Sequence, residues 1–292
     1  MSVDYLQDKI RKLKNPALLE LAPMPMELPA HILTEESSPA AACERFCREI
    51  LQGLKGIVPG VRVSFTAFAL LGSAGLDVMG NVLRSAHDLG YYVLLDAPAI
   101  YSPASAQAVA AGILGEESIY PCDGLVVAAY AGSDVVKPFL PYCKEGKKDV
   151  FAVARTANKS APELQDLLAG SRLVHVACAD HVNRYGGDCI GKCGYSRVGI
   201  LAAASSAESL RTLRGKYPRL FLLLDGYDYP NANAKNCAAA FDRFGHGAAA
   251  CAGSSICNAW KQEESDGRDF IEHAVAAAER MKKNLTRYTT IL

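Results

Sequence analysis

Polar side chains follow several short apolar segments of this 292-residue chain, at positions where barrel-shaped and sheet-based enzymes carry their reactive groups. Asp96 ends the apolar segment 91–96 and is followed by Pro98 and Tyr101. Arg62 lies in an earlier apolar segment. A carboxylate near a guanidinium can work as a charged catalytic pair or as a structural ion pair, and we expect Arg62 and Asp96 to form the structural kind.

Other segment ends carry further candidates for a pocket. Ser254 and Ser255 follow Gly253 before an expected helix, where backbone N–H groups can bind a small anion and hydroxyl groups can cap the helix. Of these two roles we expect capping. Cys251 has no evident activating base, so it is not expected to act as a nucleophile. The candidate pocket residues are Asn158, Asp225, Tyr227, Asp228, Ser254 and Ser255.

Two groups of cysteine and histidine residues have spacings that a metal site could use. Cys189 and Cys193 are four residues apart in a glycine-rich stretch, and His175, Cys178 and His181 repeat every three residues along an expected helix. Neither group has the second pair that would complete four ligands. We therefore predict no metal and no cofactor, with ordinary thiols and with histidines on a helix surface.

Eight short apolar segments must position these side chains, and each is typical of a buried strand. Their apolar residues run continuously instead of alternating, as in parallel strands that are covered on both faces. Segments with helix signals separate them. This alternation predicts a single (β/α)8 TIM barrel over residues 1–292, with an open doubly wound sheet as the alternative. The predicted strands are 17–22, 61–65, 91–96, 124–128, 150–155, 198–203, 220–225 and 248–252.

The helix signals lie between these strands. Ser102 with Pro103 predicts a helix start, because serine caps the first turn and proline fits its first position. Ser205 with Glu208 predicts a capping box, and Gly215 predicts the end of the same helix. The last helix is expected to bury one face, made of Phe270, Ala274, Ala277, Met281 and Leu285.

Composition and charge exclude several classes of protein. Lys plus Arg equals Asp plus Glu at 31 each, and no basic stripe is present, so nucleic acid is not an expected partner. No stretch has the ~18 uninterrupted apolar residues of a membrane span. The first residues lack the charged and apolar regions of a signal peptide. We expect a cytoplasmic protein that does not bind membranes.

The strand ends resemble those of the orotidine 5'-phosphate decarboxylase family in its longer bacterial form. The similarity covers nearly the whole chain and is strongest over 123–139, DGLVVAAYAGSDVVKPF. It continues over 153–158, VARTAN, and 163–167, ELQDL. The resemblance implies a barrel that forms a homodimer with active sites at the shared interface. It also implies conversion of orotidine monophosphate to uridine monophosphate and carbon dioxide, without a cofactor, by an alternating array of lysines and aspartates.

Most positions of that array differ in this chain. The family carries Asp-Ala-Lys after the third strand, then two residues, then an aspartate that is donated across the dimer. Asp96 and Ala97 match, but the lysine position is Pro98 and the second aspartate position is Tyr101. The lysine of the second strand corresponds to Arg62, which keeps the charge without a readily transferable proton.

Positions that the resemblance assigns to substrate contacts differ as well. The serine that reads the pyrimidine is Ala157, the glutamine after the seventh strand is Pro230, and the arginine that binds phosphate is Ser254. Asp225 and Asp228 add negative charge where a phosphate would lie. One such charge at about 4 Å costs roughly 4 kcal/mol at an effective dielectric constant of about 20.

We therefore predict a degenerate family member without decarboxylase activity that acts as a binding, regulatory or assembly protein linked to pyrimidine nucleotide metabolism. Its partner would be a second copy or an active homologue, and its pocket could take a nucleotide or a small anion. Two alternatives stay open: a different enzyme that uses Arg62, Asp96 and Tyr101, and a retained orotidine 5'-phosphate decarboxylase. Whether Tyr101 and Tyr227 fill or line the pocket also stays open.

Overall fold

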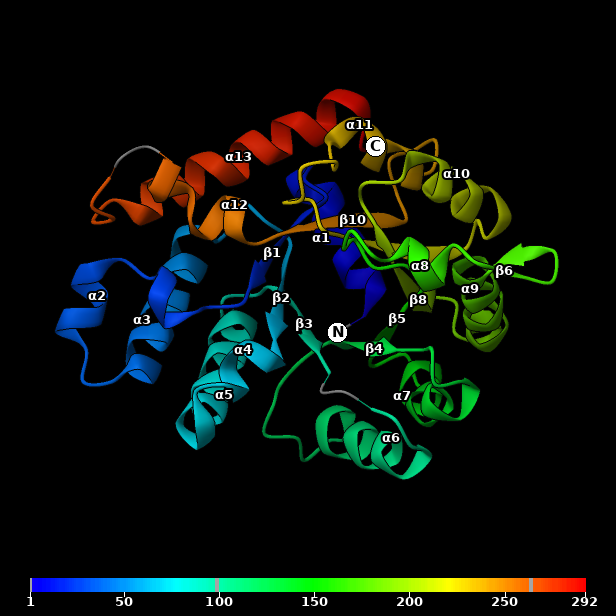
Figure 1. Cartoon of the computed structure of the whole chain (residues 1–292), viewed down its shortest axis with the longest axis horizontal. Coiled ribbons are helices and arrows are strands. Elements are labelled where there is room, and N and C mark those ends of the chain that lie inside the picture. The colour runs from blue at the N-terminus through cyan, green and yellow to red at the C-terminus, as the bar shows by residue number, and fades with distance from the viewer. Residues whose placement is uncertain (1, 98–99, 263–264) are drawn as a thin grey trace.

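A closed barrel of eight parallel strands forms the centre of the computed structural model, which describes residues 2–97, 100–262 and 265–292 (Figure 1). Around the barrel the order is β1, β2, β3, β4, β5, β8, β9 and β10, and β10 pairs with β1. This closure confirms the predicted (β/α)8 TIM barrel and excludes the open sheet. The strands are β1 (Ala17–Leu21), β2 (Gly60–Ser64), β3 (Tyr92–Asp96), β4 (Gly124–Ala128), β5 (Asp149–Val153), β8 (Ser196–Ala203), β9 (Leu220–Asp225) and β10 (Ala248–Ala252).

The apolar residues of the strands form an inner and an outer layer of the core. Successive side chains of a strand point to opposite faces. Leu18, Leu94 and Phe151 are buried together inside the barrel, whereas Leu19 and Leu95 pack with the residues of the surrounding helices. Both faces are therefore covered, which explains why the strand sequences are continuously apolar.

Helix α1 (Val3–Leu13) closes one end of the barrel. Its buried side chains Val3, Leu6 and Ile10 belong to the same cluster as the inward-facing strand residues. The opposite end, where the carboxyl ends of the strands lie, is left to the connecting loops. A site at that end is therefore built from the strand ends and the loops that follow them, over a filled barrel.

The other helices surround the barrel, and α13 runs along its outside in Figure 1. A small antiparallel hairpin, β6 (Leu168–Ala169) with β7 (Arg172–Leu173), lies between β5 and β8. The helices are α2 (Ala30–Glu35), α3 (Pro39–Gly53), α4 (Phe65–Ala69), α5 (Gly72–Asp88), α6 (Pro103–Val109), α7 (Leu140–Lys144), α8 (Pro162–Gln165), α9 (Val174–Tyr185), α10 (Ala207–Lys216), α11 (Ala234–Cys237), α12 (Ser254–Cys257) and α13 (Phe270–Tyr288).

Two predicted helix signals are confirmed. The Ser102 hydroxyl caps α6 by accepting the Ser105 N–H at 3.2 Å, and Pro103 is the first residue of the helix. Helix α13 buries the predicted face. The buried residues of that face are Phe270, Ala274, Ala277, Met281 and Leu285, together with Ala278.

The predicted ends of α10 are wrong. Ser206, not Ser205, caps this helix, because its hydroxyl accepts the Ser209 N–H at 3.4 Å while Ser205 lies in the turn that leaves β8. Glu208 is therefore one position short of the capping box. Gly215 does not end the helix, which continues through Lys216.

The side chain of Arg214 explains why the last turn of α10 persists. Its guanidinium is buried and donates hydrogen bonds to backbone carbonyls of four residues. The donor–acceptor distances are 2.7 Å to Ala240, 3.0 Å to Pro218, 2.9 Å to Leu220 and 2.6 Å to Gly247. Burial lowers the pKa of Arg214, although Tyr195 and Asp242 oppose this effect. The guanidinium thus ties α10 to the starts of β9 and β10.

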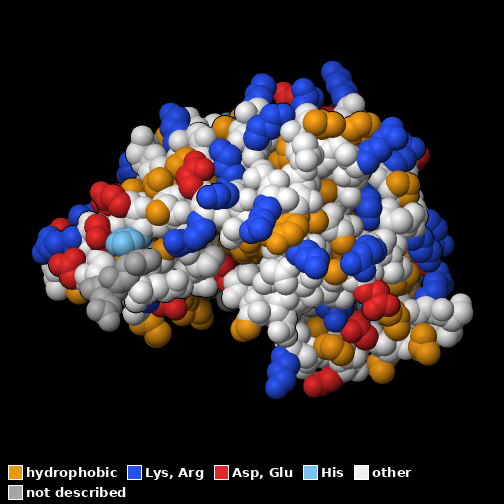
Figure 2. All heavy atoms as spheres, turned by 90° about the horizontal axis from the view of Figure 1, so that it is seen from above, with side chains coloured by type: hydrophobic (Ala, Val, Ile, Leu, Met, Phe, Trp, Pro, Cys, Tyr) orange, Lys and Arg blue, Asp and Glu red, His pale blue; other side chains and the backbone are white. Residues whose placement is uncertain are grey.

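No helix in the described ranges is long and apolar enough to cross a membrane. On the face seen in Figure 2, Lys and Arg side chains are dispersed among acidic and uncharged ones. Basic side chains predominate over the upper and right part of this view, and acidic ones lie mainly towards its left and lower edges (Figure 2).

Candidate functional site

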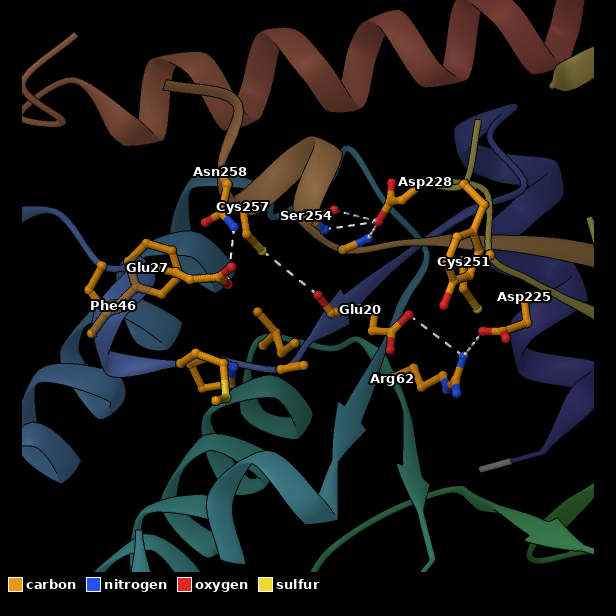
Figure 3. A pocket seen from close by; sticks show the side chains of 18 residues that line it. Glu20, Glu27, Phe46, Arg62, Asp225, Asp228, Cys251, Ser254, Cys257 and Asn258 are labelled. Carbon is orange, nitrogen blue, oxygen red and sulfur yellow. Dashed lines mark hydrogen bonds and ion pairs between the residues drawn. The ribbon is translucent and has the colours of Figure 1, made fainter. Parts of the chain in front are cut away.

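The carboxyl ends of β1, β2, β9 and β10 surround a cavity of about 450 Å³ (Figure 3). It lies at the face where (β/α)8 barrels carry out chemistry. Its charged and hydroxyl-bearing lining residues are Glu20, Glu27, Arg62, Asp225, Asp228, Tyr229 and Ser254. Its larger apolar lining residues are Leu21, Pro23, Met24, Leu28 and Phe46.

Arg62 holds three carboxylates together at the floor of this cavity. Its Nε donates to Asp96 Oδ1 at 2.8 Å and its Nη1 donates to Asp225 Oδ1 at 2.6 Å. Glu20 Oε2 lies 3.6 Å from the same Nη1. Burial opposes the charge of Arg62, but Asp96, Glu20 and Asp225 raise its pKa well above the usual value. The predicted Arg62–Asp96 ion pair is therefore present within a larger cluster.

Glu20 is a site residue that the sequence reasoning missed. Burial, helped by Asp225 and Asp96 and opposed by Arg62, raises its pKa to about 7. Around neutral pH this carboxyl group therefore exchanges a proton. A signal was present in the sequence, because Glu20 is a lone charged residue inside an otherwise apolar strand segment.

The Asp228 carboxylate accepts four hydrogen bonds from the start of α12. Its Oδ2 lies 2.7 Å from Gly253 N, 2.9 Å from Ser254 N and 3.2 Å from Ser254 Oγ. Its Oδ1 accepts the hydroxyl of Ser255. The two hydroxyls therefore bind Asp228, and the expectation that they cap the helix is wrong. The anionic group at this turn is therefore the chain's own Asp228 carboxylate.

The tyrosines predicted near the pocket lie elsewhere. Tyr101 is 82% exposed and does not line the cavity. Tyr227 is half-buried and faces a separate cleft beside Asn284 of α13. Tyr229 is the tyrosine that borders the main cavity. Pro98 lies outside the described residues.

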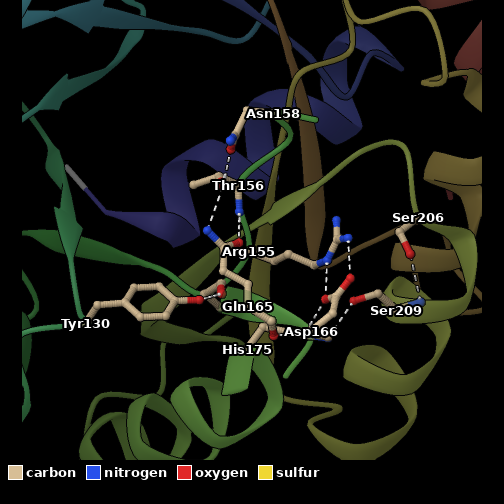
Figure 4. Close-up of polar contacts among 10 residues, drawn as sticks. Tyr130, Arg155, Thr156, Asn158, Gln165, Asp166, His175, Ser206 and Ser209 are labelled. Atoms are coloured by element: carbon tan, nitrogen blue, oxygen red, sulfur yellow. Dashed lines mark hydrogen bonds and ion pairs between the residues drawn. The ribbon is translucent and has the colours of Figure 1, made fainter. Parts of the chain in front are cut away.

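Asn158 lies in a different polar cluster, shown in Figure 4. Its Oδ1 accepts the Thr156 hydroxyl at 2.5 Å, and Gln165 makes two 2.8 Å hydrogen bonds to Thr156. Arg155 binds Asp166 through two hydrogen bonds of 3.0 and 2.8 Å. These contacts fix the segment after β5, but Asn158 itself is exposed and does not line the cavity.

The thiols of the chain are free, and most of them are buried. Burial raises the pKa of Cys178 to about 11 and of Cys251 further, so neither is a ready nucleophile. In the part of the chain that the structure describes, no three His, Cys, Asp or Glu side chains converge as a metal site would require. His181 is exposed as predicted, but His175 is buried, and its placement on the helix surface was wrong.

The comparisons with known proteins agree with this geometry. No protein-family model matches the chain. An orotidine 5'-phosphate decarboxylase of Rhodopirellula baltica is 30% identical over 260 residues, which cover 88% of this chain and 83% of that relative. One of Clostridium perfringens is 27% identical over 241 residues, or 82% of this chain and 83% of the relative.

Solved structures share the fold. A candidate orotidine-monophosphate-decarboxylase of Toxoplasma gondii superimposes with a TM-score of 0.82 at 23% identity, covering 98% of this chain and 96% of that one. The OMP decarboxylase of Leishmania donovani gives a TM-score of 0.73 at 20% identity, covering 97% of this chain and 100% of the other. The relatives that match most of this chain in sequence and the solved structures that share its barrel are orotidine 5'-phosphate decarboxylases. This chain belongs to the orotidine 5'-phosphate decarboxylase family.

Proposed function

We propose that this family member does not decarboxylate orotidine monophosphate and serves as a binding, regulatory or assembly protein linked to pyrimidine nucleotide metabolism. The observation that carries the proposal is the Asp228 carboxylate on the first turn of α12. It accepts the N–H groups of Gly253 and Ser254 and the hydroxyls of Ser254 and Ser255. A substrate phosphate would need the same donors.

Electrostatic repulsion also argues against the binding of a phosphate at this turn. A phosphate at about 4 Å from Asp228 would meet a repulsion of roughly 4 kcal/mol per pair of unit charges at an effective dielectric constant of about 20. Glu27 lines the same cavity and adds negative charge, whereas Asp225 is already paired with Arg62. A phosphorylated ligand would bind only if Asp228 moved away. The donors at the start of α12 would then have to bind the phosphate in place of the Asp228 carboxylate.

The cluster around Arg62 supports the loss of proton transfer. Its guanidinium is already paired with carboxylates, and its pKa lies far above the range in which it could donate a proton. The resemblance places the family's proton-donating lysine at Pro98, which has no side-chain proton to give. The alternative enzyme that would use Arg62, Asp96 and Tyr101 is disfavoured, because Tyr101 does not line the cavity.

An assembly role is supported by exposed apolar side chains near the same end of the barrel. Leu70, Tyr101 and Tyr130 follow the neighbouring strands β2, β3 and β4, and they are 70%, 82% and 45% exposed. A second copy or an active homologue that covered them would remove apolar surface from water. Light scattering should then give a mass of twice 31.2 kDa for the protein alone, or a mixed species after co-expression with an active decarboxylase.

The direct test is an activity and binding assay on the purified protein. We expect no loss of orotidine monophosphate absorbance above the buffer rate and no thermal stabilisation by uridine monophosphate. Asp228→Asn removes the charge and should let uridine monophosphate bind about tenfold more tightly than the wild type. Turnover of about 1 s⁻¹ or more by the wild-type protein would show instead that decarboxylase activity is retained.

A further inference from the structure

Three side chains outside the cavity are linked at the same face of the barrel by one charged contact and one hydrogen bond (Figure 4). Asp166 lies in the segment after β5, His175 is in the first turn of α9, and Ser209 is in the first turn of α10, which follows β8. His175 Nδ1 lies 3.1 Å from Asp166 Oδ1, and His175 Nε2 lies 3.0 Å from Ser209 Oγ. β5 and β8 are paired neighbours, so their carboxyl ends bring these elements together.

The hydrogen bonds fix the tautomer of the imidazole. Nδ1 faces the backbone carbonyl of Gln165 at 3.0 Å as well as Asp166 Oδ1, and both groups can only accept. Nδ1 must therefore carry the proton. The neutral ring then presents a lone pair at Nε2, to which the Ser209 hydroxyl donates. This is the arrangement in which a histidine can remove a proton from a serine.

The Asp166 carboxylate is held in place by Arg155 as well. Arg155 binds Asp166 through Nε and Nη2 and lowers the pKa of this carboxyl group, and His175 lowers it further. Asp166 is therefore ionised and can stabilise a positively charged imidazole. His175 is buried, whereas Ser209 is partly exposed.

The same turn of α10 offers two free hydrogen-bond donors. The first amides of a helix have no partner within the helix. Ser209 N donates to Ser206 Oγ, but the amides of Ala207 and Glu208 have no hydrogen-bond partner in the described part of the chain. Such donors next to a reacting hydroxyl can stabilise the oxyanion that forms when an ester is attacked.

We infer that Ser209 is a nucleophile, with His175 as its base and Asp166 as a positioning residue, and that it accepts the acyl group of small carboxylic esters. Ser209 Oγ bonds to the carbonyl carbon and its proton passes to His175 Nε2. The bond to the alcohol oxygen then breaks, and the departing oxygen takes that proton. Water, activated by the same nitrogen, releases the acid and restores the hydroxyl. This activity is independent of the barrel cavity.

Two reagents test the inference on the whole chain: a fluorophosphonate probe and p-nitrophenyl acetate. The Ser209 oxygen should displace fluoride from the probe, giving one label per chain that mass spectrometry places on Ser209. Ser209→Ala should remove the label and lower ester hydrolysis at least tenfold. Ser205→Ala is the matched control, because Ser205 lies in the preceding turn and its side chain makes no hydrogen bond among the described residues.

His175→Asn tests the base separately. It should lower the labelling rate at least tenfold while Ser209 is still present, and circular dichroism should confirm that the variant is folded. The inference is overturned if heat-unfolded protein labels as fast as native protein. It is equally overturned if Ser209→Ala labels and hydrolyses like the wild type, or if Ser205→Ala loses as much as Ser209→Ala.

Discussion

Replacing Glu20 with glutamine should change how the stability of this protein depends on pH. In the folded state burial raises the pKa of Glu20 from 4.5 to about 7. Between these two values the folded protein keeps a proton that the unfolded chain releases. The stability that Glu20 contributes is therefore full below pH 4.5 and is lost as the pH rises through 7.

The size of the Glu20 pKa shift sets the size of the change in the free energy of unfolding. A displacement from 4.5 to about 7 corresponds to roughly 3 kcal/mol at about 1.4 kcal/mol per pH unit. Because the Glu20 side chain is 26% exposed, this value is an upper bound. Glu20→Gln has nearly the same shape but cannot ionise. It should match the wild type near pH 4.5 and become more stable than the wild type, by up to about 3 kcal/mol, at pH 8.

Urea unfolding followed by the fluorescence of Trp260 measures this difference at a series of pH values. Subtracting the wild-type free energy of unfolding from that of the variant at each pH removes the contribution of all other titrating groups. Glu20→Asp is the control, because it keeps a carboxyl group at this position and should keep the loss of stability with rising pH. The reasoning is refuted if the Glu20→Gln variant differs from the wild type by the same amount at pH 5 and at pH 8, within about 0.5 kcal/mol.

Three further replacements test other contacts by the same unfolding measurement. Ser206→Ala should lower the free energy of unfolding by about 1 kcal/mol through loss of the α10 cap, while Ser205→Ala should leave it unchanged. Tyr92→Phe should cost about 1–3 kcal/mol, and more above pH 7, because its hydroxyl donates at 2.5 Å to Asp149, whose pKa burial raises to about 7. Arg214→Met should cost about 3 kcal/mol or more, since it leaves buried carbonyls without donors. An unchanged free energy would contradict the contact concerned.

The barrel could be predicted from the sequence because its signals are local. Every predicted strand ends within two residues of an observed one, since a continuous apolar run bounded by polar residues marks a strand that is covered on both faces. The buried face of α13 follows from helical spacing in the same way. The pairing of Arg62 with Asp96 follows from the order of neighbouring strands.

The details of the site could not be predicted because they depend on loops. Asp228 and Gly253 are separated by a whole strand and its connections, and only the loop conformations bring the carboxylate onto the amides. Tyr227 points away from the cavity while Tyr229 borders it, although both follow the same strand. Glu20 depends on no loop, because it lies opposite Arg62 in the neighbouring strand β1. Its lone charge in an apolar strand was a signal that the sequence reasoning did not use.

The pairing of β1 with β10 has a consequence for how the chain is made. Ala17 lies opposite Ala250, so one edge of the first strand stays unpaired until synthesis has passed the last strand. An unpaired edge can capture strands of other chains, and contacts between such distant segments form slowly. During nearly the whole of its synthesis on the ribosome, the nascent chain therefore carries an edge of β1 that has not yet paired with β10. We expect chaperone binding during translation to centre on the segment around β1.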